Sequence, residues 1–171
     1  MSANVDTVKT FITALQSGDM TLAAQTCAPE LVVSGLMTRP LGKNEFFAVQ
    51  SELLAAMPDF SYNLSAVHQD HADIHALIHI SGTHTQSLSL PSLGLRPIPP
   101  TGLAIDLPQV ETLFQVENEQ VLAMEMDQEA GGGLVGLLQQ VGAELPLEPR
   151  RRVMPDPAYP EQEPGPMDID L

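Results

Sequence analysis

A histidine between two threonines stands near the middle of the sequence. Residues 82–85 (Gly-Thr-His-Thr) end one run of alternating residues, and residues 99–102 (Pro-Pro-Thr-Gly) precede the next. A strand that ends in a histidine, loops over and returns as a strand can form the mouth of a pocket. Because the unperturbed pKa of histidine lies near neutrality, His84 could orient or protonate a substrate oxygen. The alternative is a histidine that is only hydrogen-bonded at the end of a strand.

Two further histidines, His75 and His79, lie four residues apart. On a helix this spacing would give a pair of metal ligands. Isoleucines at positions 74, 78 and 80, followed by Gly82, favour a strand instead. On a strand the two side chains share a face but lie about 13 Å apart, which is too far for one ion. We therefore expect no zinc or other metal site here.

The composition predicts an aliphatic core. The chain has 171 residues, of which 43% are hydrophobic and only 4% aromatic, with no tryptophan. This length is typical of one domain with a substantial core. Eight methionines suit a cavity of irregular apolar shape, although ordinary core packing is the simpler explanation.

The charge argues against two classes of partner. The formal net charge is -15, and only Arg150–Arg152 form a basic cluster, in an acidic context. Nucleic acids and anionic membranes require a clustered basic face, so we expect neither as a partner. Cys27 is the single cysteine, which leaves no disulfide framework. No signal peptide or membrane span is recognisable, so we expect a cytoplasmic protein.

Hydrophobic periodicity predicts the elements that position these residues. Apolar residues at helical spacing predict helices over residues 5–15, 20–25 and 43–57, ended by Gly18, Pro29 and Pro58. Alternating or β-branched runs predict strands over residues 31–34, 60–66, 74–83, 103–107, 110–116 and 121–127. Pro108 predicts a bend, and residues 134–142 predict a short helix after a glycine joint at 131–133. Helices followed by a run of antiparallel strands indicate an α+β fold.

The end of the chain differs from the rest. From residue 145 it holds seven prolines and no periodic pattern. Such a segment cannot bury enough apolar surface to offset its conformational entropy. We therefore expect one domain over residues 1–144 and a disordered or extended, proline-rich acidic tail over residues 145–171.

The order of these elements resembles a known family over residues 4–143. Together with residues 58–60 (Pro-Asp-Phe), 82–85, 99–102 and 137–142 (Leu-Leu-Gln-Gln-Val-Gly), it is similar to the SnoaL-like polyketide cyclases, or ester cyclases. The resemblance implies the cone-like fold of nuclear transport factor 2-like proteins. In that fold three N-terminal helices pack on a curved antiparallel sheet that encloses a pocket. The same fold also serves proteins that only bind or assemble, so fold alone does not give function.

The resemblance also implies candidate site residues. In the characterised cyclases an aspartate near the end of the last strand acts as general acid/base, without metal or organic cofactor. The candidates here are Asp127 and Glu129, because an apolar wall would raise a carboxyl pKa towards neutrality. The chain departs from the family in lacking a tryptophan before the acid and in carrying extra residues over 128–133.

These observations give one leading hypothesis and one rival. The leading hypothesis is a cofactor-free protein, expected to be a homodimer, that binds a small apolar oxygenated molecule and catalyses its cyclisation or isomerisation. Asp127 or Glu129 would be the acid/base and His84 would polarise an oxygen; the expected substrate-binding residues are Thr83, Thr85, Glu111 and Met124. The rival is a non-catalytic ligand-binding or assembly module. If Asp127 and Glu129 both face solvent, the enzyme hypothesis should be dropped.

Overall fold

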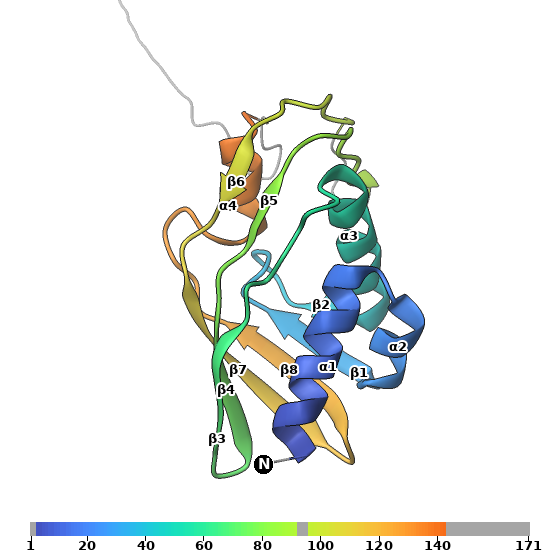
Figure 1. The fold of residues 1–171 in the computed structure, drawn as a ribbon, viewed down its shortest axis with the longest axis vertical. Helices are drawn as coiled ribbons and strands as arrows, with labels where there is room; N and C mark the ends of the chain where they lie inside the picture. Colours follow the sequence, from blue (N-terminus) through green and yellow to red (C-terminus); the bar gives the residue numbers. More distant parts are fainter. Residues whose placement is uncertain (1–2, 92–95, 143–171) are drawn as a thin grey trace, which may run out of the picture.

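The computed structural model describes residues 3–91 and 96–142. In these residues helices α1, α2 and α3 come early in the chain and helix α4 comes last (Figure 1). The helices are α1 (Ala3–Ser17), α2 (Met20–Gln25), α3 (Lys43–Ala56) and α4 (Gly133–Gln140). The strands are β1 (Cys27–Ser34), β2 (Leu41–Gly42), β3 (Ser65–Asp70), β4 (Asp73–Ile78), β5 (Ser81–Thr83), β6 (Ala104–Asp106), β7 (Val110–Glu117) and β8 (Gln120–Met126). The predicted α+β class is confirmed. The predicted tail over 145–171, and its boundary with the domain, lie outside the described residues.

The strands form two sheets. The larger sheet has the order β2-β1-β8-β7-β4-β3, and β5 pairs with β6 in a separate ribbon. All pairs are antiparallel except β1 with β8, which run parallel. The expectation of a wholly antiparallel sheet is therefore wrong at this one pair, because β1 enters the sheet directly from helix α2 and lies beside the last strand.

The three early helices form where the periodicity predicts them. Helix α1 buries one apolar stripe and ends at Ser17; the next residue, Gly18, has a φ of 84°, which suits a residue without a Cβ. Asp19 then caps α2, its carboxylate accepting a hydrogen bond of 3.1 Å from the backbone N–H of Leu22. The predicted role of Pro29 is wrong, because α2 has already ended at Gln25 and Pro29 lies within β1.

One strand lies later in the chain than its pattern predicts. The alternation over 60–66 predicts a strand, whereas β3 is Ser65–Asp70 and is largely exposed. Phe60 and Tyr62 are buried in an irregular segment. Its backbone bonds do not form a continuous ladder: Ser61 and Ser81 exchange two hydrogen bonds in one isolated β-bridge, and His79 N–H donates to the Tyr62 carbonyl. The alternate residues of this segment are buried, so its sequence pattern is that of a strand although it forms no continuous β-ladder.

The sheet changes direction at two matched positions. The predicted strand over 74–83 is divided into β4 and β5, and the bend predicted at Pro108 separates β6 from β7. Leu107 N–H donates to the Ile80 carbonyl across this break at 2.9 Å. Helix α4 is joined to the two-stranded ribbon of β5 and β6, since the Gln140 side-chain amide accepts from the Asp106 N–H and donates to the Asp106 carbonyl, both at 2.9 Å.

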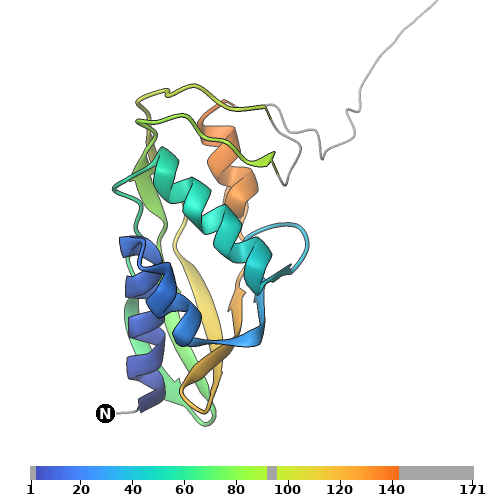
Figure 2. The ribbon, with the colours of Figure 1, turned by 90° about the vertical axis from the view of Figure 1, so that its right-hand side faces the viewer.

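Helices α1, α2 and α3 lie on one face of the larger sheet (Figure 2). Alternate residues of the central strands point to these helices and are buried, while the residues between them point to the opposite, outer face. The inner set comprises Ile74, Ala76, Ile78, Val110, Thr112, Phe114 and Val116. The core is aliphatic, as the composition predicts. No helix in the described part of the chain is long and apolar enough to cross a membrane.

Candidate functional site

His84 lies directly after β5 and points into the interior. Its relative exposure is 1%. The backbone is held on both sides, because His84 N–H donates to the Leu103 carbonyl at 2.9 Å and Gly102 N–H donates to the His84 carbonyl at 2.8 Å. The ring nitrogen Nδ1 lies 2.9 Å from Thr101 Oγ1, whereas Nε2 is buried with no hydrogen-bond partner among the described residues. The structure thus joins the motifs at 82–85 and 99–102 around one unpartnered nitrogen.

The two threonines beside His84 face away from the interior. Thr83 donates to the Asp59 carboxylate from its backbone N–H at 2.7 Å and from its hydroxyl at 2.8 Å. These bonds hold the pKa of Asp59 below its usual value. Thr85 is exposed, and its N–H donates to the Ala56 carbonyl at the end of α3. Both threonines therefore tie the end of β5 to neighbouring elements, and neither is turned towards His84.

The two candidate acids, Asp127 and Glu129, lie directly after β8. Met124 and Met126 point inward and are buried, so Glu125 and Asp127 fall on the other face; both are exposed. Asp127 N–H donates to the Glu111 carbonyl at 2.9 Å. Glu129 is also exposed. Asp127 also borders a small hollow lined by Ile78 and Val110, so it does not face solvent alone and the condition for dropping the enzyme hypothesis is not fully met.

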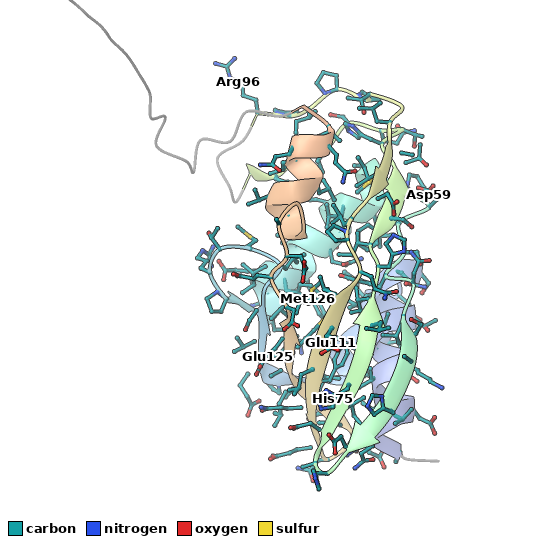
Figure 3. All side chains as sticks on the ribbon, turned by 90° about the vertical axis from the view of Figure 1, so that its left-hand side faces the viewer. Asp59, His75, Arg96, Glu111, Glu125 and Met126 are labelled. Carbon is teal, nitrogen blue, oxygen red and sulfur yellow. The ribbon has the colours of Figure 1, made fainter. Side chains whose placement is uncertain are left out.

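An open groove of about 400 Å³ lies on the outer face of the sheet. Figure 3 shows this face, with α1 behind the strands. The groove is lined by Glu111, Glu125, Asp127 and His75, and by Gly35 and Leu113. Within the described ranges no lysine or arginine pairs with these carboxylates. Asp127 and Glu111, two of the expected site residues, thus come together, but on the face opposite to His84.

Glu129 belongs to a neighbouring hollow of about 210 Å³, beside the glycine segment 131–133. This segment docks closely: Leu134 N–H donates to the Leu36 carbonyl at 2.7 Å, and a Cβ on Gly133 would lie 2.9 Å from the same carbonyl oxygen. The extra residues over 128–133 therefore serve to bring α4 against the loop that follows β1.

The remaining expected residues are distributed between the two faces. Met124 is fully buried on the inner face of β8, whereas Glu111 is exposed outside. The Thr112 hydroxyl and Glu52 Oε1 are also buried without a partner in the described part of the chain. Burial raises the pKa of Glu52. The interior therefore contains a few unpartnered polar atoms among aliphatic side chains.

The two histidines with metal-ligand spacing have separate partners. His75 stacks on His68 with 5.5 Å between ring centroids, and His79 bonds the Asp106 carboxylate. In residues 3–91 and 96–142 no group of three or more histidine, cysteine, aspartate or glutamate residues could hold a metal ion. Arg96, on the loop, is exposed and points away from the protein (Figure 3).

Sequence reasoning missed a buried polar chain next to α1. Tyr62 donates its hydroxyl to the Gln50 amide oxygen, and the Gln50 amide donates to the Leu15 carbonyl at 3.2 Å. Complete burial raises the pKa of Tyr62, which keeps the phenol protonated. The signal was present in the sequence, since Gln50 falls among the apolar positions of its helix.

Comparison with known proteins adds the family and the fold. A family model described as SnoaL-like polyketide cyclase matches residues 5–125, a range that includes His84 and ends two residues before Asp127. No curated protein matches.

Solved structures of similar fold come from several bacteria. A proposed SnoaL-like polyketide cyclase from Jannaschia sp. CCS1 has a TM-score of 0.62 at 19% identity, over 83% of this chain and 93% of that one. IdmH, a proposed polyketide cyclase from Streptomyces antibioticus, has a TM-score of 0.60 at 19% identity, over 82% and 99%. An LEH-like epoxide hydrolase from M. tuberculosis has a TM-score of 0.58 at 14% identity, over 82% and 88%. These low identities show a shared fold and no more.

Proposed function

Because the chain belongs to the SnoaL-like polyketide cyclase family, we propose that it binds a small, largely apolar, oxygenated molecule inside the fold, with His84 as the polar contact. The observation that carries this proposal is the buried, unpartnered Nε2 of His84. Buried polar atoms are nearly always hydrogen-bonded, and leaving one unpaired costs about 1–3 kcal/mol. An oxygen atom of a bound molecule would supply the missing partner.

The surroundings of His84 support the choice of an apolar ligand. The interior is built from aliphatic side chains and methionine, with few polar atoms. Binding sites for small molecules typically combine apolar walls with a small number of placed polar groups. Methionine also adapts its shape to irregular ligands.

We favour binding over cyclisation. A carboxylate that exchanges protons near neutral pH needs an apolar environment to raise its pKa. Asp127 and Glu129 are exposed; Asp127 lines the outer groove, and the hollow that it shares with buried residues such as Ile78 is only about 10 Å³. The shared fold of cyclases and an epoxide hydrolase does not choose a reaction. Acid/base cyclisation through Asp127 remains the second candidate, since Asp127 and Glu111 do line one groove.

The homodimer and the cytoplasmic location stay predictions. For the dimer, the open outer face of the sheet is the surface that a second copy would cover, by analogy with the family fold. Light scattering of the purified chain, with the molecular mass at several concentrations, tests this; a monomer mass throughout would contradict it.

The test of the function is native mass spectrometry of the purified full chain, combined with two matched variants. We expect wild type and Asp127→Asn to retain the same small-molecule mass, and His84→Leu to lose it. Because a cyclisation or isomerisation leaves the mass unchanged, the molecules released from wild type and Asp127→Asn are also compared by liquid chromatography. A different isomer released from Asp127→Asn would indicate an accumulated substrate and favour cyclisation. Retention by His84→Leu equal to that of wild type would contradict the role of His84.

A further inference from the structure

Thr101 contacts both His84 and the backbone of the returning chain. Its hydroxyl oxygen lies 2.9 Å from His84 Nδ1 and 3.3 Å from the backbone nitrogen of Leu103. The Leu103 N–H can only donate, so the hydroxyl oxygen accepts that bond. The single hydroxyl proton is then free to be donated to Nδ1.

The hydroxyl oxygen could also accept from an Nδ1–H, but the hydroxyl proton would then have no acceptor among the described residues, so this arrangement favours a ring proton on Nε2. A neutral imidazole carries one proton, and the nitrogen that accepts a hydrogen bond is the one without it. If Nδ1 accepts from Thr101, then Nε2 carries the proton. The contact with Leu103 then uses the backbone N–H proton of Leu103, and the contact with His84 Nδ1 uses the hydroxyl proton of Thr101.

We infer that Thr101 is a positioning residue that holds His84 in the Nε2–H tautomer, so that His84 presents a hydrogen-bond donor to a carbonyl-type oxygen of the ligand. The inference rests on the proposed function for the identity of the site, but the tautomer itself does not depend on any ligand. A ketone, ester or enolate oxygen matches this donor. A group that can only donate does not.

The backbone around His84 makes Thr101 a suitable residue to test. The bonds of His84 with the Leu103 carbonyl and the Gly102 N–H do not involve the Thr101 side chain. Thr101 is also exposed, so Thr101→Val, which keeps the shape and removes the hydroxyl, should leave the fold intact. Thr101→Ser keeps the hydroxyl and is the matched control.

The first measurement is the ring tautomer of His84 in the full chain without ligand. Histidine ring nitrogens are labelled with 15N, His84→Leu assigns the signal, and spectra are recorded above the titration range of histidine. We expect the Nε2–H tautomer in wild type and Thr101→Ser, and a mixture of tautomers in Thr101→Val. The Nδ1–H tautomer in wild type, or an unchanged tautomer in Thr101→Val, would overturn the inference.

The second measurement uses 1-tetralone as a probe and tetralin, which lacks the oxygen, as its control. We expect 1-tetralone to shift the His84 Nε2–H signal and to bind roughly threefold to tenfold more weakly to Thr101→Val, as the loss of one hydrogen bond predicts. Tetralin should not shift this signal. Equal binding of 1-tetralone to wild type and Thr101→Val overturns the positioning role. Binding of neither compound, with the tautomer as expected, contradicts the proposed function and leaves the tautomer established.

Discussion

The interior around His84 and the outer groove around Asp127 lie on opposite faces of one fold, and they treat polar groups in opposite ways. Inside, His84 Nε2 is buried with no partner, as are the Thr112 hydroxyl and one oxygen of Glu52, in the described part of the chain. Outside, three carboxylates line one open groove in reach of solvent. Burial makes a polar group selective, because it then needs one particular partner; exposure allows water to satisfy it. The motif around His84, which has fewer charged residues than the segment around Asp127, is therefore the better candidate site.

The largest change is expected at Gly35, where the edge of the groove meets the backbone of β8. A Cβ there would lie 1.9 Å from the Met126 carbonyl oxygen, and the φ of 89° adds strain. We expect Gly35→Ala to lower the free energy of unfolding by about 3 kcal/mol or more. Urea denaturation followed by circular dichroism measures this. Gly42→Ala, which has no atom within 4 Å of its Cβ, is the control; equal losses in both would refute the contact.

A second prediction compares two buried polar side chains: Tyr62, which has a hydrogen-bond partner, and His84, whose Nε2 has none in the described part of the chain. Tyr62→Phe leaves the Gln50 amide oxygen without its donor in a completely buried position. We expect a loss of about 1–3 kcal/mol in the free energy of unfolding. His84→Leu should cost less, because it removes an unpartnered nitrogen together with one partnered one. Thermal unfolding of the two variants side by side checks this, and a larger loss in His84→Leu would mean that Nε2 has a partner.

The alternation of side chains along a strand could by itself have assigned the expected site residues to the two faces of the sheet. Met124 and Asp127 differ by three positions, so on a regular strand they cannot both line one cavity. The same holds for Glu111, which lies between the inward-facing Val110 and Thr112. The family resemblance suggests Asp127 as a pocket acid, and the alternation of β8 directs its side chain to the outer groove. Its role in catalysis stays a prediction.

Other features could not be derived from the sequence. Gly18 and Pro58 follow the ends of α1 and α3 and Asp19 caps the start of α2, so these bounds were predictable from local signals. The parallel pairing of β1 with β8 depends on contacts between distant residues, which no local pattern encodes. The Thr101–His84 contact spans 17 positions and likewise depends on the loop between them.

A third change uses pH to probe the support of β5. The two bonds from Thr83 lower the pKa of Asp59 in the folded protein, so their stabilisation is present above the unfolded value and is lost as the pH falls through the folded one. Asp59→Ala should therefore unfold at a lower temperature than wild type at pH 6, and the difference should shrink towards pH 3. Because Asp59 is exposed, we expect a difference of only a few degrees. A difference that is constant over this range would show that charge at Asp59 plays no part.

The smallest change is expected in the outer groove, and its sign is the informative part. Glu111, Glu125 and Asp127 share the groove, and no lysine or arginine in the described ranges pairs with them. Like charges in one groove repel, so Glu111→Gln should raise the free energy of unfolding by a few tenths of a kcal/mol at low salt. High salt should abolish the gain, because it screens the repulsion. Glu117→Gln, on the same strand but outside the groove, should show a smaller gain. A loss of stability in Glu111→Gln would mean that its carboxylate makes a net stabilising interaction in the folded protein, and the proposed repulsion in the groove would be wrong.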